Sequence, residues 1–146
     1  MHAICDGERW VVLPPAQDHK RLLDADLGPN TGGMGTFAPT PRVSAELMAR
    51  IERDIIGRAV RGMAEDGCPF RGCLFAGLMI SPQGEPVLLE FNVRFGDPET
   101  QVLMGLIDAD LAEVFASAAQ GSLTQGLSVR QAHALCVVLP PRPARR

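Results

Sequence analysis

The segment EFNVRFGDPETQ, at residues 90–101, concentrates side chains that can bind a cation or an anion. Four of these side chains carry oxygen atoms of the hard kind that magnesium prefers. A fifth is an arginine, whose planar fork of N–H donors suits phosphate or carboxylate. The five are Glu90, Asn92, Arg94, Asp97 and Glu99. Their types and spacing predict a site that combines a metal ion with an anion.

A strand through this segment would place alternate side chains on opposite faces of a sheet. Burying Glu90 and Arg94 among apolar neighbours would cost on the order of several kcal/mol per ion unless each charge is matched. An internal ion pair of Arg94 with Glu90 or Asp97 would match them without any ligand. The density of oxygen ligands and the sharp turn expected at residues 96–98 favour a ligand cleft instead. We expect one face to carry the chemistry, with Leu88, Glu90, Asn92 and Arg94, and the other to face the core, with Leu89, Phe91, Val93 and Phe95.

Residues 17–41 form a polar, glycine-rich stretch with little hydrophobic periodicity. The glycine spacing from Gly28 to Gly33 fits a phosphate-binding P-loop, but the required lysine and hydroxyl residue do not follow it. A dinucleotide-binding motif beginning at Gly33 also fails, because prolines stand where its helix should start and no strand precedes it. We expect a flexible loop whose backbone amides close over an anion; a solvated surface turn is the alternative.

Three segments of the sequence together resemble one enzyme family. They are QDHKRLLDADLGPNTGGMGTFAPTP at residues 17–41, GCLFAGLMI at 72–80, and EFNVRFGDPETQ at 90–101. In this order they are similar to phosphoribosylamine–glycine ligase, also called glycinamide ribonucleotide synthetase, an ATP-grasp ligase family of purine biosynthesis. The resemblance covers residues 1–139, which we expect to be part of an ATP-grasp domain, and leaves residues 140–146 as an irregular tail.

The resemblance implies a reaction in which glycine is joined to 5-phosphoribosylamine with cleavage of ATP, through a glycyl phosphate. ATP would be the co-substrate and Mg²⁺ or Mn²⁺ the cofactor. Glu90 and Asn92 match the family's metal positions, and Arg94 matches the cation beside the transferred phosphate, which makes it the implied catalytic residue. The implied substrate-binding residues are Asp18, Lys20, Gly33, Asp97 and Glu99.

The same resemblance implies that this chain is a truncated piece, well under half of the family's enzyme. The segment that holds the triphosphate in the family has no counterpart here. A catalytically silent remnant or binding domain, without the nucleotide clamp, is therefore the alternative function. A plain α+β domain, whose acidic strand is only an ion network, is a third interpretation.

Two hairpins and several helices are expected to position these motifs. The hairpins occupy residues 1–13 and 72–93, the helices residues 44–64, 102–107 and 110–121, and a last strand residues 134–139. Ser44 and Asp110 are the expected helix N-caps, and Leu103, Met104 and Phe115 are core candidates. The predicted fold class is α+β, an antiparallel sheet with packed helices that corresponds to the C-terminal part of an ATP-grasp domain.

The composition limits the remaining function classes. With 146 residues, 46% of them hydrophobic, and a net charge of −3, the chain is typical of one globular domain and lacks a basic surface for nucleic acid. No apolar run reaches the roughly 20 residues of a membrane helix and no signal peptide is evident, so we expect a cytoplasmic protein that acts on small molecules. The four cysteines are expected to be buried small hydrophobes, not zinc ligands or disulfides. Apolar surface left uncovered by truncation predicts self-association.

Overall fold

The computed structural model describes residues 1–124 and 126–139. Its elements in chain order are β1 (His2–Asp6), β2 (Trp10–Val12), β3 (Gln17–Leu23), the 3-10 turn η1 (Asp24–Asp26), β4 (Leu27–Ala38), α1 (Ala45–Ile51), the π-helical η2 (Glu52–Ile56), α2 (Gly57–Glu65), β5 (Arg71–Ile80), β6 (Pro86–Asn92), α3 (Glu99–Leu106), α4 (Leu111–Gln120) and β7 (Ala134–Val137). The strands form two antiparallel sheets, ordered β2-β1-β5-β6 and β3-β4-β7, where the sequence predicted one. The α+β class with antiparallel strands and packed helices is confirmed.

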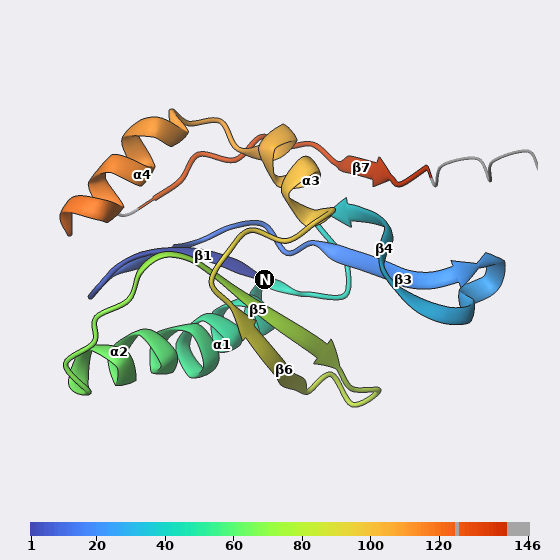
Figure 1. The fold of residues 1–146 in the computed structure, drawn as a ribbon, viewed down its shortest axis with the longest axis horizontal. Helices are drawn as coiled ribbons and strands as arrows, with labels where there is room; N and C mark the ends of the chain where they lie inside the picture. Colours follow the sequence, from blue (N-terminus) through green and yellow to red (C-terminus); the bar gives the residue numbers. More distant parts are fainter. Residues whose placement is uncertain (125, 140–146) are drawn as a thin grey trace, which may run out of the picture.

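Strand β1 runs through the middle of the four-stranded sheet and is covered on both faces. Cys5 packs with Ile56 and Val60 of the η2–α2 helix on one face. On the other face, Ile4 packs with Leu103 of α3, and α4 covers the same face (Figure 1). This double cover explains why all five residues of β1 are buried.

The helix predicted at residues 44–64 is present, but its buried stripe differs from the regular four-residue spacing of apolar side chains that predicts it, at Leu47, Ile51, Ile55, Ala59 and Met63. A π-helical turn closes its hydrogen bonds one residue later than an α-turn, so η2 inserts one extra residue into the periodicity. The buried stripe therefore passes from Ile51 to Ile56 and Val60. Met63, which a regular helix would have placed on the same stripe, is 41% exposed.

Both predicted helix N-caps are confirmed. The Ser44 hydroxyl accepts a hydrogen bond from the Leu47 amide at 3.2 Å. The Asp110 carboxylate accepts hydrogen bonds from the amides of Ala112 at 2.9 Å and Glu113 at 3.2 Å. These caps satisfy amides that a helix start leaves without intrahelical partners.

The stretch at residues 17–41 is mostly a hairpin, and the prediction of a flexible loop was wrong. Strands β3 and β4 pair antiparallel along this stretch, and β4 also pairs with β7. Sequence periodicity missed them because neither strand alternates cleanly between apolar and polar residues. Gly35 permits the close approach of β7, since a Cβ there would lie 2.9 Å from the carbonyl oxygen of Cys136.

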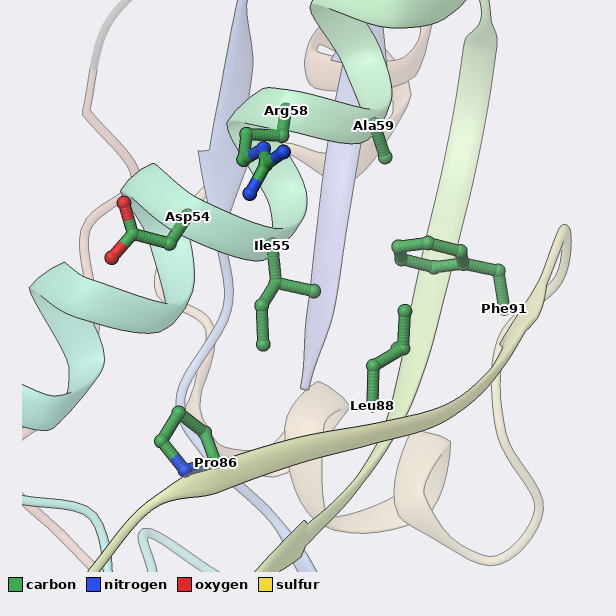
Figure 2. A pocket seen from close by; sticks show the side chains of 7 residues that line it. All are labelled: Asp54, Ile55, Arg58, Ala59, Pro86, Leu88 and Phe91. Carbon is green, nitrogen blue, oxygen red and sulfur yellow. The ribbon is translucent and has the colours of Figure 1, made fainter.

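Strands β5 and β6 form the predicted second hairpin, but a β-bulge changes which side chains share a face. Gly77 pairs with Glu90, whereas the next residue of β5 pairs with Leu88, so Leu89 is an extra residue on β6. Leu88 therefore lies with Phe91 on the side of the helix (Figure 2). The prediction that Leu88 shares a face with Glu90 was wrong. The predicted core face is also largely solvent-exposed, with Leu89 63% exposed, because β6 is an edge strand.

Helices α3 and α4 and strand β7 confirm the predicted order of the C-terminal elements. Leu103 is fully buried and Met104 packs against the same cluster, but Phe115 is 40% exposed, which contradicts its assignment to the core. Cys5 is buried as expected, whereas Cys68, in the turn after α2, is exposed. None of the helices among the described residues is long and apolar enough to cross a membrane. The predicted tail at residues 140–146 lies outside the described residues.

Candidate functional site

Glu90 and Asn92 lie side by side at the end of β6. The side-chain amide of Asn92 donates a hydrogen bond to Oε1 of Glu90 at 3.1 Å. Gly77, opposite Glu90 on β5, leaves space for this pair, because a Cβ at that position would lie 3.3 Å from Cγ of Glu90. The hairpin thus presents a carboxylate and an amide oxygen together, with Glu90 exposed.

Glu90 and Asn92 together offer two oxygen ligands, which fits a magnesium ion that takes most of its other ligands from water and substrate. The hydrogen bond uses one oxygen of Glu90 and the nitrogen of Asn92, which leaves the other carboxylate oxygen and the amide oxygen free to coordinate. No group of three or more His, Cys, Asp or Glu residues suited to a metal occurs within residues 1–124 and 126–139. A metal here would need waters and phosphate oxygens, as magnesium commonly does in nucleotide sites.

Arg94, two residues beyond the pair, is exposed. Its guanidinium donates to the carbonyl oxygen of Phe95 at 3.0 Å. It takes part in none of the salt bridges formed by the described residues. The internal ion pair with Glu90 or Asp97, which was the structural alternative, is therefore absent from this part of the chain. The remaining N–H donors of Arg94 are available to an anion.

The turn at residues 96–99 connects this strand to α3 and is held at several points. The carbonyl oxygen of Gly96 accepts a hydrogen bond from the Thr100 amide at 3.0 Å. The Gly96 amide donates to Nε2 of His2 at 3.0 Å, a contact with a residue 94 positions away in sequence. The exposed Asp97 carboxylate accepts a hydrogen bond from the side chain of Gln101 at 2.9 Å.

The β3–β4 hairpin meets this turn at Gly33. A Cβ at Gly33 would lie 2.6 Å from Cδ of Pro98 and 3.0 Å from Oδ1 of Asp18, at a φ of +141°. Only a residue without a side chain allows this approach, which brings β3, β4 and the turn together. Four of the five predicted substrate-binding residues belong to this junction: Asp18, Gly33, Asp97 and Glu99.

The carboxylates of Asp18 and Glu99 are largely shielded from solvent. Glu99 is 6% exposed, and the Asp18 side chain is 10% exposed. Neither oxygen of Asp18 has a hydrogen-bond partner among the described residues. Lys20, the fifth predicted residue, places its Nζ 3.6 Å from Asp18, but its side chain is 57% exposed.

The environment of the two carboxylates changes their proton affinity. Burial raises the pKa of Glu99, and the negative charge of nearby Asp18 acts in the same direction. Burial also raises the pKa of Asp18, although Lys20 opposes the shift. Two desolvated carboxylates of this kind favour a group that brings positive charge or N–H donors.

The sequence analysis missed His2 and Gln101, which hold the turn. His2 stands in a strand among apolar residues, and no local pattern ties it to a turn more than ninety positions away. A histidine in an otherwise apolar strand was nevertheless a visible signal, because a buried imidazole needs a hydrogen-bond partner. Gln101 was part of the quoted motif but received no role.

A hollow of about 500 Å³ lies on the other side of β6, between the strand and the helix (Figure 2). Ile55 and Ala59 of the helix and Leu88 and Phe91 of β6 supply its apolar wall, and Arg58 stands at its rim. Its lining contains none of the predicted site residues. The polar site and this apolar hollow are therefore separate features.

Comparisons with known proteins agree on one family. Residues 1–100 match the family model of the phosphoribosylglycinamide synthetase ATP-grasp (A) domain. The chain is 51% identical over 141 residues to a phosphoribosylamine–glycine ligase of Rhizobium meliloti, covering 95% of this chain and 33% of that protein. It is 52% identical over 124 residues to the trifunctional purine biosynthetic protein adenosine-3 of Bos taurus, covering 85% of this chain and 12% of that protein.

A solved structure shows the same fold. The crystal structure of phosphoribosylamine–glycine ligase from Thermotoga maritima aligns with a TM-score of 0.86 and 36% identity, over 98% of this chain and 36% of that one. The chain thus spans about a third or less of the length of these relatives. Sequence and structure lead to one conclusion: the chain belongs to the phosphoribosylglycinamide synthetase ATP-grasp (A) domain family.

Proposed function

We propose that this chain carries part of the active site of an ATP-dependent ligase that joins glycine to 5-phosphoribosylamine in purine biosynthesis. The relatives that it matches bear the name phosphoribosylamine–glycine ligase, which supports the reaction class. The observation that carries the proposal is the junction of Asp18, Gly33 and Glu99, where two desolvated carboxylates lie close enough to repel each other and neither oxygen of Asp18 accepts a hydrogen bond from the described residues. We place the reaction in the cytoplasm.

We assign the transfer of the γ-phosphoryl group to the residues at the end of β6. The glycine carboxylate, which is already ionised and needs no base, would attack the γ-phosphate of ATP, form glycyl phosphate and release ADP. Arg94 would hold the attacking carboxylate and the transferred phosphoryl group together, since positioning and charge stabilisation dominate such steps. Glu90 and Asn92 would hold Mg²⁺ or Mn²⁺, whose chemistry is to spread the charge of the phosphate oxygens.

We assign the binding of the amine substrate to the junction between the β3–β4 hairpin and the turn at residues 96–99. The amine of 5-phosphoribosylamine would bring N–H donors to the nearby carboxylate of Glu99 and to Asp18, neither of whose oxygens accepts a hydrogen bond from the described residues. The amine would attack the carbonyl carbon of glycyl phosphate, form the amide bond and displace phosphate. A carboxylate with a raised pKa is a better proton acceptor at neutral pH, so this pair can take the proton that the amine loses in that step. Gln101 holds Asp97 beside them, and Lys20 balances part of the charge.

Calorimetric titration of the purified chain with Mg·ATP tests the proposal. We expect binding that Glu90→Gln weakens by at least about tenfold, or ~1.4 kcal/mol, because the variant loses an ionised metal ligand. The matched control is Glu113→Gln, which removes an exposed carboxylate from α4, outside the site. Equal affinity of Glu90→Gln and wild type would contradict the assignment. Absence of binding by the folded wild type would favour the alternative, a catalytically silent domain without a nucleotide clamp.

A further inference from the structure

We propose that His2 is a positioning residue that fixes the turn at residues 96–99 by accepting a hydrogen bond from the Gly96 amide. Its Nε2 atom lies 3.0 Å from the Gly96 nitrogen, and the imidazole is fully buried. The ring stacks on Phe75, with centroids 4.2 Å apart and planes 9° apart, and on Phe95 at 6.0 Å. The two phenylalanines leave the ring little freedom, so the acceptor has a fixed position.

The turn is held through the backbone of Gly96, which lies against both His2 and Glu99. A Cβ there would lie 3.1 Å from Nε2 of His2 and 2.8 Å from Cδ of Glu99, so the imidazole and the carboxylate approach the same backbone atom. The two polar groups of the Gly96 backbone are then both used, the amide by His2 and the carbonyl by Thr100. Arg94 precedes Gly96 by two positions and Asp97 follows it directly, so a hydrogen bond that holds the Gly96 backbone restricts the main chain that carries both residues.

Packing alone does not account for the histidine. Because Nε2 accepts a hydrogen bond, the neutral ring carries its proton on Nδ1. Nδ1 is buried and has no partner among the described residues, which costs stability that a leucine in the same space would not cost. Burial lowers the pKa of His2 to about 3, and the positive charges of the amino terminus and Arg94 act in the same direction, so the acceptor persists at neutral pH. What a leucine could not supply is the acceptor for Gly96.

Two variants separate the acceptor from the packing. His2→Gln retains an acceptor oxygen at about the distance of Nε2 from the main chain, whereas His2→Leu fills similar space without one. Amide hydrogen exchange followed by NMR reports the contact directly. In His2→Leu we expect Gly96 to exchange at least about tenfold faster than in wild type, while amides of the β1 core keep their protection. In His2→Gln we expect the protection of Gly96 to return.

A second readout follows the position of the turn and not the hydrogen bond. Titration of the Glu99 carboxyl, monitored by ¹³C NMR, should show the raised pKa in wild type and in His2→Gln. In His2→Leu the pKa should move toward its ordinary value, since a released turn exposes Glu99 to water. Unchanged Gly96 exchange and an unchanged Glu99 titration in His2→Leu would overturn the proposal. So would failure of the folded His2→Gln to restore either.

The consequence for catalysis rests on the proposed function, and the two NMR readouts do not. If the ligase reaction is measurable, His2→Leu should raise the KM for the amine substrate by about tenfold, with a smaller change in kcat, and His2→Gln should reverse it. A wild-type chain without turnover would count against the proposed function for this chain alone. The exchange and titration results would still decide the role of His2.

Discussion

Glu99 is the residue at which stability and the proposed activity should oppose each other. Its folded-state pKa is raised by burial, so the folded chain binds its proton more tightly than the unfolded chain. The contribution of Glu99 to stability is therefore fully present below the unfolded pKa and is lost as the pH rises through the folded pKa. We expect this contribution of Glu99 to the free energy of unfolding to fall with rising pH across the acidic window.

Glu99→Gln should remove this pH dependence, because the amide cannot ionise. We expect the variant to gain about 1 kcal/mol at neutral pH, where the wild type carries a buried charge, and to weaken the proposed ligase activity. Urea unfolding at a series of pH values measures the first effect, with Glu113→Gln as the exposed control. The difference in free energy of unfolding between wild type and Glu99→Gln isolates the Glu99 contribution, because other carboxylates with lowered pKa values, such as Asp6, affect both proteins alike. A difference that moves in favour of the wild type as the pH rises, or a neutral-pH loss in Glu99→Gln, would contradict the assignment.

For single residues, the sequence predicted that Glu90 and Asn92 share a face, but it did not predict the burial of other carboxylates of the proposed site. Glu90 and Asn92 were expected on one face and are hydrogen-bonded to each other. The burial of Asp18 and Glu99 was not foreseen, because it arises from a junction of three segments that are distant in sequence. Their raised pKa values follow from that junction and not from any local pattern.

Among the elements, the β3–β4 hairpin depends on one glycine for its contact with the turn before α3. Gly33→Ala would place a Cβ 2.6 Å from Cδ of Pro98 and would hold an alanine at a φ of +141°, which L residues rarely adopt. We expect a loss of roughly 2–3 kcal/mol in the free energy of unfolding, since steric strain and backbone strain add. Urea unfolding provides the measurement.

Gly32→Ala is the matched control for that change. Apart from Gly32 itself and its two chain neighbours, no atom of the described residues lies within 4 Å of a Cβ built at Gly32, so the substitution should change stability by less than about 0.5 kcal/mol. Equal effects of the two substitutions would show that hairpin flexibility, and not the close approach at Gly33, matters. The same comparison in a Mg·ATP titration would show whether the junction contributes to binding.

The sequence predicted the type and order of most elements but not their irregularities. Helices were predicted from apolar periodicity and caps, and these local signals also exist in the folded chain. The π-helical turn η2 and the bulge at Leu89 each insert one residue into a regular pattern, and each moves the buried side chains to a different face. Such insertions are selected by tertiary packing, which periodicity does not encode. The β3–β4 hairpin escaped prediction for a related reason, since its strands lack an alternating pattern.

On the surface of the whole molecule, β7 exposes apolar side chains at the edge of a sheet. Leu135 is 73% exposed and Val137 63%, and both lie on one face of an edge strand that pairs only with β4 in the described part of the chain. Alternate residues of β7 face α3 and the core, so the outward apolar residues do not stabilise the fold. An apolar face beside an unpaired strand edge favours association between chains.

We therefore expect the purified chain to self-associate and expect Leu135→Lys combined with Val137→Lys to reduce that association. Two lysines on an edge strand oppose pairing by charge repulsion and by removing apolar area. Light scattering over a concentration series measures the mean mass. The matched control adds the same two charges elsewhere, at the exposed positions Ala112 and Gln120 of α4. A wild-type chain that stays monomeric at high concentration would contradict the prediction, and equal effects of both lysine pairs would assign it to net charge and not to β7.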